Sequence, residues 1–322
     1  MKANKALGTL LVLLGVCALF YLFMNNGKTS LSGIFSGFTK PVYEQRTFAT
    51  DRLLNVEIES NSLDVDVVRG IGDDIVVTLK GRATKAEADD LQLSAEEDGD
   101  TLKLSLQSNN GFHIGFNWSN VKLTVELPDQ TWDSFSAELN SGDLSIDSAE
   151  FNNAELNTNS GDIKAESITA LTNLKVVANS GDISLEEVTG KTVELENNSG
   201  DLTIDRYEAD LIQFDIRSGD VSLEDGVAQL NGEAGSGDIR LNADDLEYNT
   251  DLKAGSGDII INLSRDPESL AVQFSSGSGD CIVRKDGFVE QGKNGDSDAN
   301  GSFGSGDLKL SARTSSGDIV LR

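Results

Sequence analysis

Apolar and polar residues alternate along most of the second half of the chain, in short runs that recur at nearly constant spacing. Each run follows a Ser-Gly-Asp tripeptide and has the form apolar–any–apolar, as in Leu144–Ile146 and Ile183–Leu185. Alternation with a period of two is typical of a strand that buries one face. The pattern therefore predicts short strands, each preceded by a tight turn at glycine.

The spacing of the tripeptide predicts stacked repeats. Its first six intervals are 19, 20, 19, 19, 18 and 20 residues. A period of this size indicates units that cannot bury their own apolar face alone. We therefore predict an all-β fold, a parallel β-helix or β-solenoid with coils of about 19–20 residues. Antiparallel hairpin repeats in a β-sandwich are the alternative, because Leu139 and Leu144 could pair across their turn. The ten copies begin at Ser141, Ser160, Ser180, Ser199, Ser218, Ser236, Ser256, Ser278, Ser305 and Ser316.

The last two copies are unevenly spaced. Ser278 and Ser316 are 38 residues apart, which is two periods of 19, whereas Ser305 does not fit this spacing. We therefore expect Ser316 to be the true corner and Ser305 to open the strand Leu308–Ala312. The segment between them, roughly 285–304, is then an insertion, and insertions in stacked repeats form surface loops.

Glycine and aspartate have separate roles at the predicted corners. Glycine supplies a positive φ, and the side chains of Asn, Ser and Asp can bond nearby backbone groups to close a turn. The predicted structural corners are Gly142, Asp143, Gly161, Asp162, Gly181, Asp182, Gly200, Asp201, Gly219, Asp220, Gly237, Asp238, Gly257, Asp258, Gly279, Asp280, Gly317 and Asp318.

Stacking about 4.8 Å apart would place equivalent residues in columns. Asn140, Asn159, Asn179 and Asn198 would then form an amide ladder. The column of aspartates has two interpretations. Each carboxylate accepts backbone N–H bonds within its own turn, or the column forms a weak strip for divalent cations.

The alternating pattern begins well before the first perfect repeat. Residues 51–139 read as irregular β coils and 140–322 as the repeat solenoid, with no linker between them. Asn61–Asp64 is similar to a decayed corner. The segment 83–91 could form one or two helical turns, but it lacks strong periodicity, and we expect it to be a loop.

The first fifty residues differ in composition from the rest. Residues 6–24 are uncharged and mostly apolar, about 28 Å long as a helix, and predict a transmembrane signal-anchor helix. Lys2 and Lys5 place residues 1–5 in the cytoplasm and the rest outside, which predicts a single-pass cell-membrane protein. Residues 25–50 read as a stalk. A cleavable signal peptide and a lipoprotein modified at Cys17 are the alternatives.

Composition excludes some classes of partner. The net charge of −28 and a pI of about 4.2 argue against nucleic acid, whose binders need Lys and Arg. Two cysteines cannot form a disulfide framework. Cys281 stands where other repeats carry Ile, Leu or Val, and we expect a small core hydrophobe there.

One segment has the spacing of a calcium loop. Oxygen-bearing side chains, a turn glycine at Gly301 and a final carboxylate occur in the required order within the insertion. The alternative is a polar surface loop, because no helix-forming sequence flanks it. Apart from this possible calcium, the sequence indicates no cofactor. The candidate ligands are Asp296, Asp298, Asn300, Ser302 and Asp307.

The sequence indicates no catalytic constellation. The sole histidine, His113, lies in a Gly/Asn-rich stretch, and a Ser/His/Asp or Cys/His arrangement needs a histidine with partners. We therefore expect a non-enzymatic protein; the alternative is a cell-wall polysaccharide lyase or hydrolase built on a β-helix. The aromatic residues just before the repeats are expected to cap the stack or, alternatively, to bind carbohydrate. They are Phe112, Phe116, Trp118 and Trp132.

A strand that ends in proline, Val121–Pro128 (VKLTVELP), is followed by regularly spaced Asn-Ser-Gly-Asp units. This arrangement resembles the bacterial putative-adhesin β-strand-repeat proteins over about residues 50–322. The short tail, single anchor and stalk make it similar to the LiaG-like membrane-anchored proteins of the Lia envelope-stress operon. The resemblance implies a β-helical cell-surface protein without established catalytic residues. Its partners would be other envelope or membrane proteins or wall polymers.

Overall fold

The computed structural model describes residues 39–108, 120–292 and 295–322. The predicted anchor at 6–24 and most of the predicted stalk lie outside these residues, as do Phe112, His113, Phe116 and Trp118. Within the described ranges, no helix is long and apolar enough to span a bilayer.

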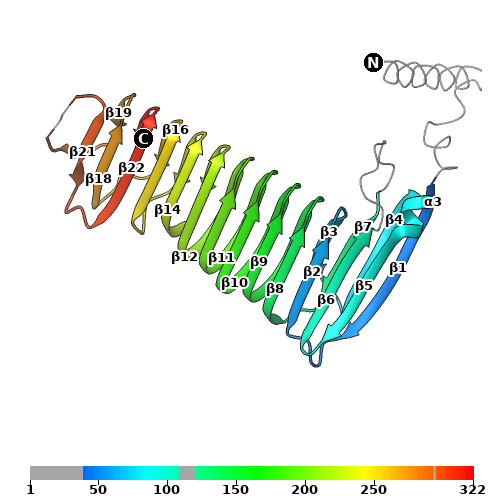
Figure 1. Ribbon diagram of the computed structural model, residues 1–322. Coiled ribbons are helices and arrows are strands. Elements are labelled where there is room, and N and C mark those ends of the chain that lie inside the picture. Colours follow the sequence, from blue (N-terminus) through cyan, green and yellow to red (C-terminus); the bar gives the residue numbers. More distant parts are fainter. Residues whose placement is uncertain (1–38, 109–119, 293–294) are drawn as a thin grey trace, which may run out of the picture.

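The described residues form one continuous sheet of 23 strands, arranged as a stack of coils (Figure 1). In the repeats, strands follow one another at the predicted period, and each pairs in parallel with the equivalent strand of the next coil. Ile163, for example, lies opposite both Leu144 and Ile183. The antiparallel-hairpin alternative is therefore wrong for the repeats. Their strands are β9 (Leu144–Thr158), β10 (Ile163–Ala178), β11 (Ile183–Asn197), β12 (Leu202–Ser218), β13 (Val221–Glu224), β14 (Val227–Ser236), β15 (Ile239–Ala243), β16 (Thr250–Ser256) and β17 (Ile259–Leu263).

The C-terminal end of the stack does not follow chain order. Strand β22 pairs in parallel with both β16 and β18, and β23 pairs with both β17 and β19. The last coil of the chain therefore lies between the two coils that precede it in sequence (Figure 1). The strands of this end are β18 (Leu270–Ser276), β19 (Cys281–Val283), β20 (Val289–Glu290), β21 (Asp298–Phe303), β22 (Leu308–Ser316) and β23 (Ile319–Leu321).

The expected insertion at 285–304 is part of the sheet and not only a surface loop. Its strand β21 pairs antiparallel with β18, and β20 pairs antiparallel with β21. Because an uncovered sheet end exposes unpaired N–H and C=O groups, these two antiparallel strands close part of the terminal coil.

The N-terminal end is built in the same way. Strand β2 pairs in parallel with β6 and β8, and β3 pairs in parallel with β7 and β9, so the first coil of the chain lies between the second coil and the third. Three antiparallel pairs complete this end: β4 pairs with β7, β1 pairs with β4, and β5 pairs with β6. The strands are β1 (Thr39–Ala49), β2 (Asn55–Ser60), β3 (Asp64–Arg69), β4 (Asp74–Thr84), β5 (Leu91–Asp98), β6 (Thr101–Ser108), β7 (Lys122–Leu127) and β8 (Thr131–Leu139).

A short helix, α3 (Lys85–Asp90), occupies the segment that was expected to be a loop. Thr84 forms a capping box with Glu87: the Thr84 hydroxyl accepts the Glu87 N–H at 3.3 Å, and the Glu87 carboxylate accepts the Thr84 N–H at 3.1 Å. This pair of bonds satisfies backbone donors that would otherwise be left open at the helix start. The expectation of a loop was wrong because six residues are too few to show helical periodicity.

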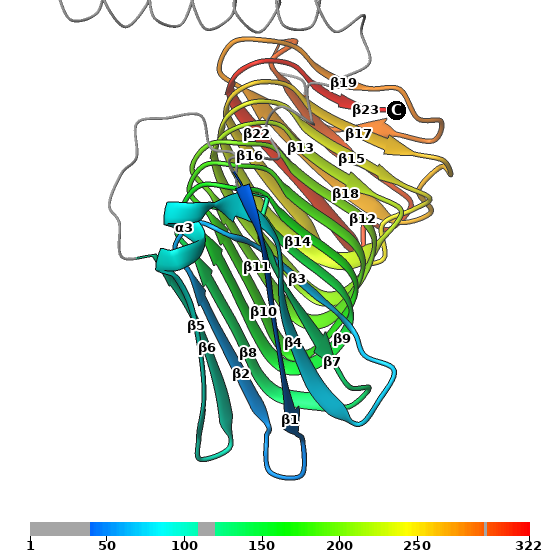
Figure 2. The same cartoon turned by 90° about the vertical axis from the view of Figure 1, so that its right-hand side faces the viewer.

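The core lies between two rows of strands, which Figure 2 shows from the N-terminal end. Burial alternates along each strand, so that Ile163, Ala165 and Val176 are fully buried. Burial of one large apolar side chain contributes about 1.5–3 kcal/mol. At the N-terminal end, Trp132 is 1% exposed and the rings of Phe135 and Phe151 are 4.9 Å apart. Trp132 is therefore a core residue and offers no platform for carbohydrate.

Candidate binding surface

The corner aspartates form one hydrogen-bonded column along the stack. In each step, Oδ1 of one aspartate accepts the backbone N–H of the aspartate in the next coil, at 2.8–3.0 Å. The donor belongs to the neighbouring coil, so the expectation of bonds within each turn was wrong. The column starts at Asp64, which confirms the decayed corner at 61–64. In spatial order the column is Asp64, Asp143, Asp162, Asp182, Asp201, Asp220, Asp238, Asp258, Asp318 and Asp280.

Two opposing effects act on this column. Neighbouring carboxylates about 4.8 Å apart repel by roughly 0.9 kcal/mol at the dielectric constant of water. A hydrogen bond to a charged group contributes about 1.5–3 kcal/mol. The bonds therefore outweigh the repulsion, and the column joins each coil to the next.

The corner glycines are required by both conformation and space. All nine predicted corner glycines have φ between 128° and 145°, a region that L side chains rarely adopt. A Cβ at Gly181 would lie 2.1 Å from the carbonyl oxygen of Gly161. Gly317 shares this conformation, whereas Gly306 of the irregular copy has φ of 72°. The prediction that Ser316 opens the true corner is confirmed.

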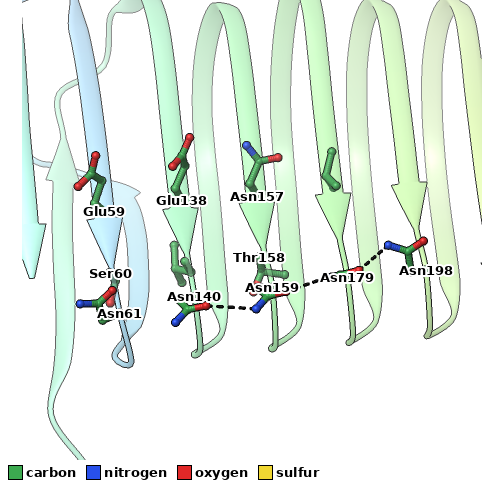
Figure 3. Close-up of a pocket in the computed structure, with 12 residues that line it drawn as sticks. Glu59, Ser60, Asn61, Glu138, Asn140, Asn157, Thr158, Asn159, Asn179 and Asn198 are labelled. Carbon is green, nitrogen blue, oxygen red and sulfur yellow. Dashed lines mark hydrogen bonds between the residues drawn. The ribbon is translucent and has the colours of Figure 1, made fainter. Parts of the chain in front are cut away.

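The predicted asparagine ladder is present beside the glycine corners (Figure 3). Asn159 Nδ2 donates to Asn140 Oδ1 at 3.2 Å, and Asn179 Nδ2 donates to Asn159 Oδ1 at 2.7 Å. Asn198 Nδ2 donates to Asn179 Oδ1 in the same way. Each inner amide of the ladder uses one N–H and one lone pair of its oxygen. The second N–H and the second lone pair remain for other partners.

The ladder borders an open groove of about 580 Å³. A second row of polar side chains runs parallel to the ladder, two residues earlier on the strands β2, β8 and β9 (Figure 3). It consists of Glu59, Glu138 and Asn157. Thr158, which is 4% exposed, also lines the groove, and its hydroxyl has no hydrogen-bond partner in the described part of the chain. The groove thus offers amide and carboxylate groups at the spacing of adjacent strands. Such a surface suits an extended polymer with repeated hydrogen-bonding groups.

A second column of corners was not predicted. Ser148, Ser167, Glu187, Arg206 and Asp225 have φ between 50° and 58°, although none is glycine. Arg206 pairs there with Glu186, Glu187 and Asp205. The Ser167 hydroxyl and the Arg206 guanidinium lower the pKa of Glu187 below its ordinary value. No residue type marks these corners in the sequence; only their spacing of 19–20 residues could have revealed them.

The structure does not bring the five candidate calcium ligands together. Asp298, Asn300 and Ser302 lie on the extended strand β21, where alternate residues are about 6.6 Å apart. Calcium ligands lie only 2.3–2.6 Å from the ion. Asp307 accepts hydrogen bonds from the hydroxyls of Ser305 and Ser269, at 2.7 and 2.9 Å, and these lower its pKa.

Among the residues that the structure describes, no group of three or more His, Cys, Asp or Glu side chains is arranged to hold a metal ion. The strand β21 would have to leave its extended conformation before its side chains could share one ion. Calcium binding at Asp296 and its neighbours stays a prediction.

Cys281 lies next to this segment, and its predicted place among core residues is confirmed in part. The side chain is half-buried and packs against the core, and its Sγ donates to the Ser297 carbonyl oxygen at 3.0 Å. Burial, with a smaller contribution from the Asp298 carboxylate, raises the pKa of Cys281 to about 11.

Several solved structures resemble this fold. A putative adhesin from Bacteroides fragilis is 15% identical with a TM-score of 0.44, and the match covers 87% of this chain and 97% of that one. A putative adhesin from Parabacteroides distasonis is 13% identical, with a TM-score of 0.44 and the same coverage. A putative lipid binding protein from Parabacteroides distasonis is 17% identical, with a TM-score of 0.42 and coverage of 87% and 96%.

No curated protein matches the sequence significantly. The family model described as Toastrack DUF4097 matches residues 54–172 and again residues 157–322. Together the two matches span the irregular N-terminal coils and all of the repeats. The chain therefore belongs to the Toastrack DUF4097 family.

Proposed function

We propose that this chain is a non-enzymatic binding protein of the cell envelope, in which a β-solenoid displays a polar surface outside the membrane. The observation that carries the proposal is the groove beside the asparagine ladder. There the parallel stack repeats the same hydrogen-bonding groups from coil to coil, and it fixes their spacing through the bonds between aspartates. A preformed array of this kind recognises an extended ligand without having to order itself first.

The location of the protein is part of the proposal. Residues 6–24 act as a single membrane anchor, with residues 1–5 in the cytoplasm and the solenoid outside. The net charge of −28 keeps the repeats soluble and away from anionic lipid. The partners are wall polymers or other envelope proteins, and the protein serves as an adhesin-like accessory in the response to envelope stress. The similarity to the LiaG-like arrangement of tail, anchor and stalk supports this last point.

Photo-crosslinking in cells tests the proposed surface. A photoreactive amino acid replaces Asn157 in the groove of the full-length protein, and in a matched control it replaces Lys164. Lys164 is exposed on the short strand segment that follows the glycine corner, in the other row of strands. We expect an envelope component to be captured from position 157 and not from position 164. Equal capture from both positions, or none from 157, would contradict the proposal.

Protease treatment of intact protoplasts tests the topology. The repeats should be digested from outside while the first residues stay protected. A mature protein that begins after residue 24 would overturn the proposed anchor.

A further inference from the structure

A second cavity, of about 460 Å³, opens where the regular repeat is interrupted. In the coils before it, a single strand such as β11 runs through the second corner. In the coil of 18 residues that follows, β13 ends at Glu224 and β14 begins at Val227, and in the next coil β15 ends at Ala243 and β16 begins only at Thr250. Segments 225–227 and 247–248 therefore line the cavity in place of a continuous sheet.

Tyr207 is the most buried polar side chain of this cavity. It is 4% exposed, and its ring packs so closely on Gly226 that a Cβ there would lie 2.3 Å from Tyr207 Cγ. Within the described chain its hydroxyl forms no hydrogen bond, and because the oxygen is not among the fully buried side-chain atoms that lack a partner, it is open to a partner from outside the protein. Burial raises the pKa of Tyr207, and the carboxylate of Asp225 raises it further. The hydroxyl therefore stays protonated near neutral pH and can donate or accept a hydrogen bond.

The charge around this hydroxyl is entirely negative. Glu208, Asp210, Asp225 and Glu247 line the cavity, and neither Lys nor Arg does. In the described ranges, none of these four carboxylates takes part in an ion pair. The nearby Arg206 is paired with Glu186, Glu187 and Asp205. The cavity thus attracts a positive charge that the protein itself does not supply.

The second aromatic residue of the cavity is Tyr248, which is 45% exposed, and Val227 and Ala209 add apolar surface. Carboxylates, aromatic faces and apolar surface together suit an organic cation. The carboxylates accept charge-assisted hydrogen bonds, and a tyrosine face attracts a cation by about 0.5–2 kcal/mol. A bare metal ion fits less well, because no three carboxylates of the described chain are arranged to hold one.

We propose that this cavity binds a primary ammonium group on a short apolar stem, as in a lysine side chain of a partner polypeptide. The ammonium would lie in the negative field of the four carboxylates and pair with one of them, near the Tyr207 hydroxyl, and the stem would lie along Tyr248 and Val227. This site is distinct from the asparagine-ladder groove, so its failure would leave the proposed envelope role standing.

Calorimetric titration of the purified full-length protein at 150 mM salt tests the site. The probe is N-acetyl-lysine methylamide, and the neutral control is the norleucine analogue of the same length. We expect the lysine probe to bind and the norleucine probe to give no measurable heat. Free glucosamine distinguishes an amino sugar from a lysine side chain as the source of the ammonium. Tighter binding of glucosamine would overturn the assignment to a polypeptide.

Three variants separate this site from the general negative charge of the protein. Glu208→Gln with Glu247→Gln should raise the dissociation constant at least tenfold. Glu97→Gln with Glu290→Gln removes the same charge from exposed positions at the two ends of the stack and should change it less than twofold. Tyr207→Phe removes only the hydroxyl and should weaken binding several-fold without lowering the melting temperature. Equal weakening in both double variants, or binding of the norleucine probe, would overturn the proposal.

Discussion

Oδ1 of Asp258 accepts a hydrogen bond from the backbone N–H of Asp318 at 2.8 Å, although the two residues are 60 positions apart in the sequence. Asp280, which follows Asp258 in the repeat, bonds to Asp318 instead. The C-terminal coil thus lies between two coils that precede it in the sequence. Removal of the last coil would therefore leave a gap inside the stack and not merely shorten it.

The corner glycines should tolerate no side chain. Gly181→Ala forces φ of 138° on an alanine and places its Cβ 2.1 Å from the Gly161 oxygen. We expect a loss of about 2–4 kcal/mol in the free energy of unfolding. Gly72→Ala is the matched control, because nothing lies within 4 Å of its Cβ position, and it should change stability by less than about 0.5 kcal/mol. Similar losses in both variants, measured by denaturant unfolding, would contradict the assigned corners.

The aspartate column predicts opposite effects for two substitutions at one site. Asp182 Oδ1 accepts the Asp201 N–H at 2.8 Å. Asp182→Ala removes this acceptor together with the repulsion, and should destabilise the protein by up to about 1 kcal/mol. Asp182→Asn keeps an acceptor oxygen and removes repulsion with both neighbouring carboxylates, so it should be neutral or stabilising at low salt. Thermal unfolding at 20 and 500 mM salt measures both. A larger loss for Asn than for Ala would show that the negative charge itself is needed.

The thiol of Cys281 should react slowly. With a pKa raised to about 11, roughly one molecule in a thousand carries the thiolate at pH 8. In a Cys17→Ser background we expect slow labelling by a thiol reagent in the folded state, and fast labelling after denaturation. The folded-state rate should rise as pH increases through 9 and 10. A folded-state rate at pH 8 equal to the denatured rate would refute the burial described here.

The decrease in the free energy of unfolding at acidic pH should depend in part on Asp307. Its pKa is lowered from an ordinary value of 3.8 by the hydroxyls of Ser305 and Ser269. A carboxyl group whose folded pKa is depressed stabilises the fold above its unfolded pKa, and this contribution is lost as pH falls through the folded value. Ser269→Ala should raise the pKa of Asp307, as measured by NMR titration of its carboxyl carbon. Ser222→Ala, which lies in another coil, should leave it unchanged. An Asp307 pKa unaffected by Ser269→Ala would contradict these bonds.

Much of the stack could be predicted because its local rules repeat. Positive φ at Gly161, the amide ladder at Asn159 and the parallel register of Ile163 all follow from one residue pattern and one period. The order of the last coils could not be predicted in this way. The 38 residues from Ser278 to Ser316 are two periods whether the coils stack in chain order or not.

The other unpredicted features are not marked by any residue type in the sequence. The second corner at Arg206 uses a positive φ without glycine. Gly226 and Gly232 are placed to make room for the rings of Tyr207 and Phe214 in the coil before them. The reason for each glycine becomes clear only when the ring that faces it is known. The sequence alone therefore does not show that the glycine and the aromatic residue are in contact.

The spatial order of the last coils is the most direct test of this account, and a pair of disulfide variants measures it. In a Cys17→Ser, Cys281→Ser background, Ser256→Cys is combined either with Ser316→Cys or with Ser278→Cys. Ser256 lies directly opposite Ser316, whereas Ser278 is one strand further along. Adjacent strands are about 4.8 Å apart, and a disulfide cannot bridge Cα atoms more than about 7 Å apart. We predict rapid oxidation of the 256–316 pair and none of the 256–278 pair, as followed by electrophoresis; the reverse result would contradict the inserted C-terminal coil.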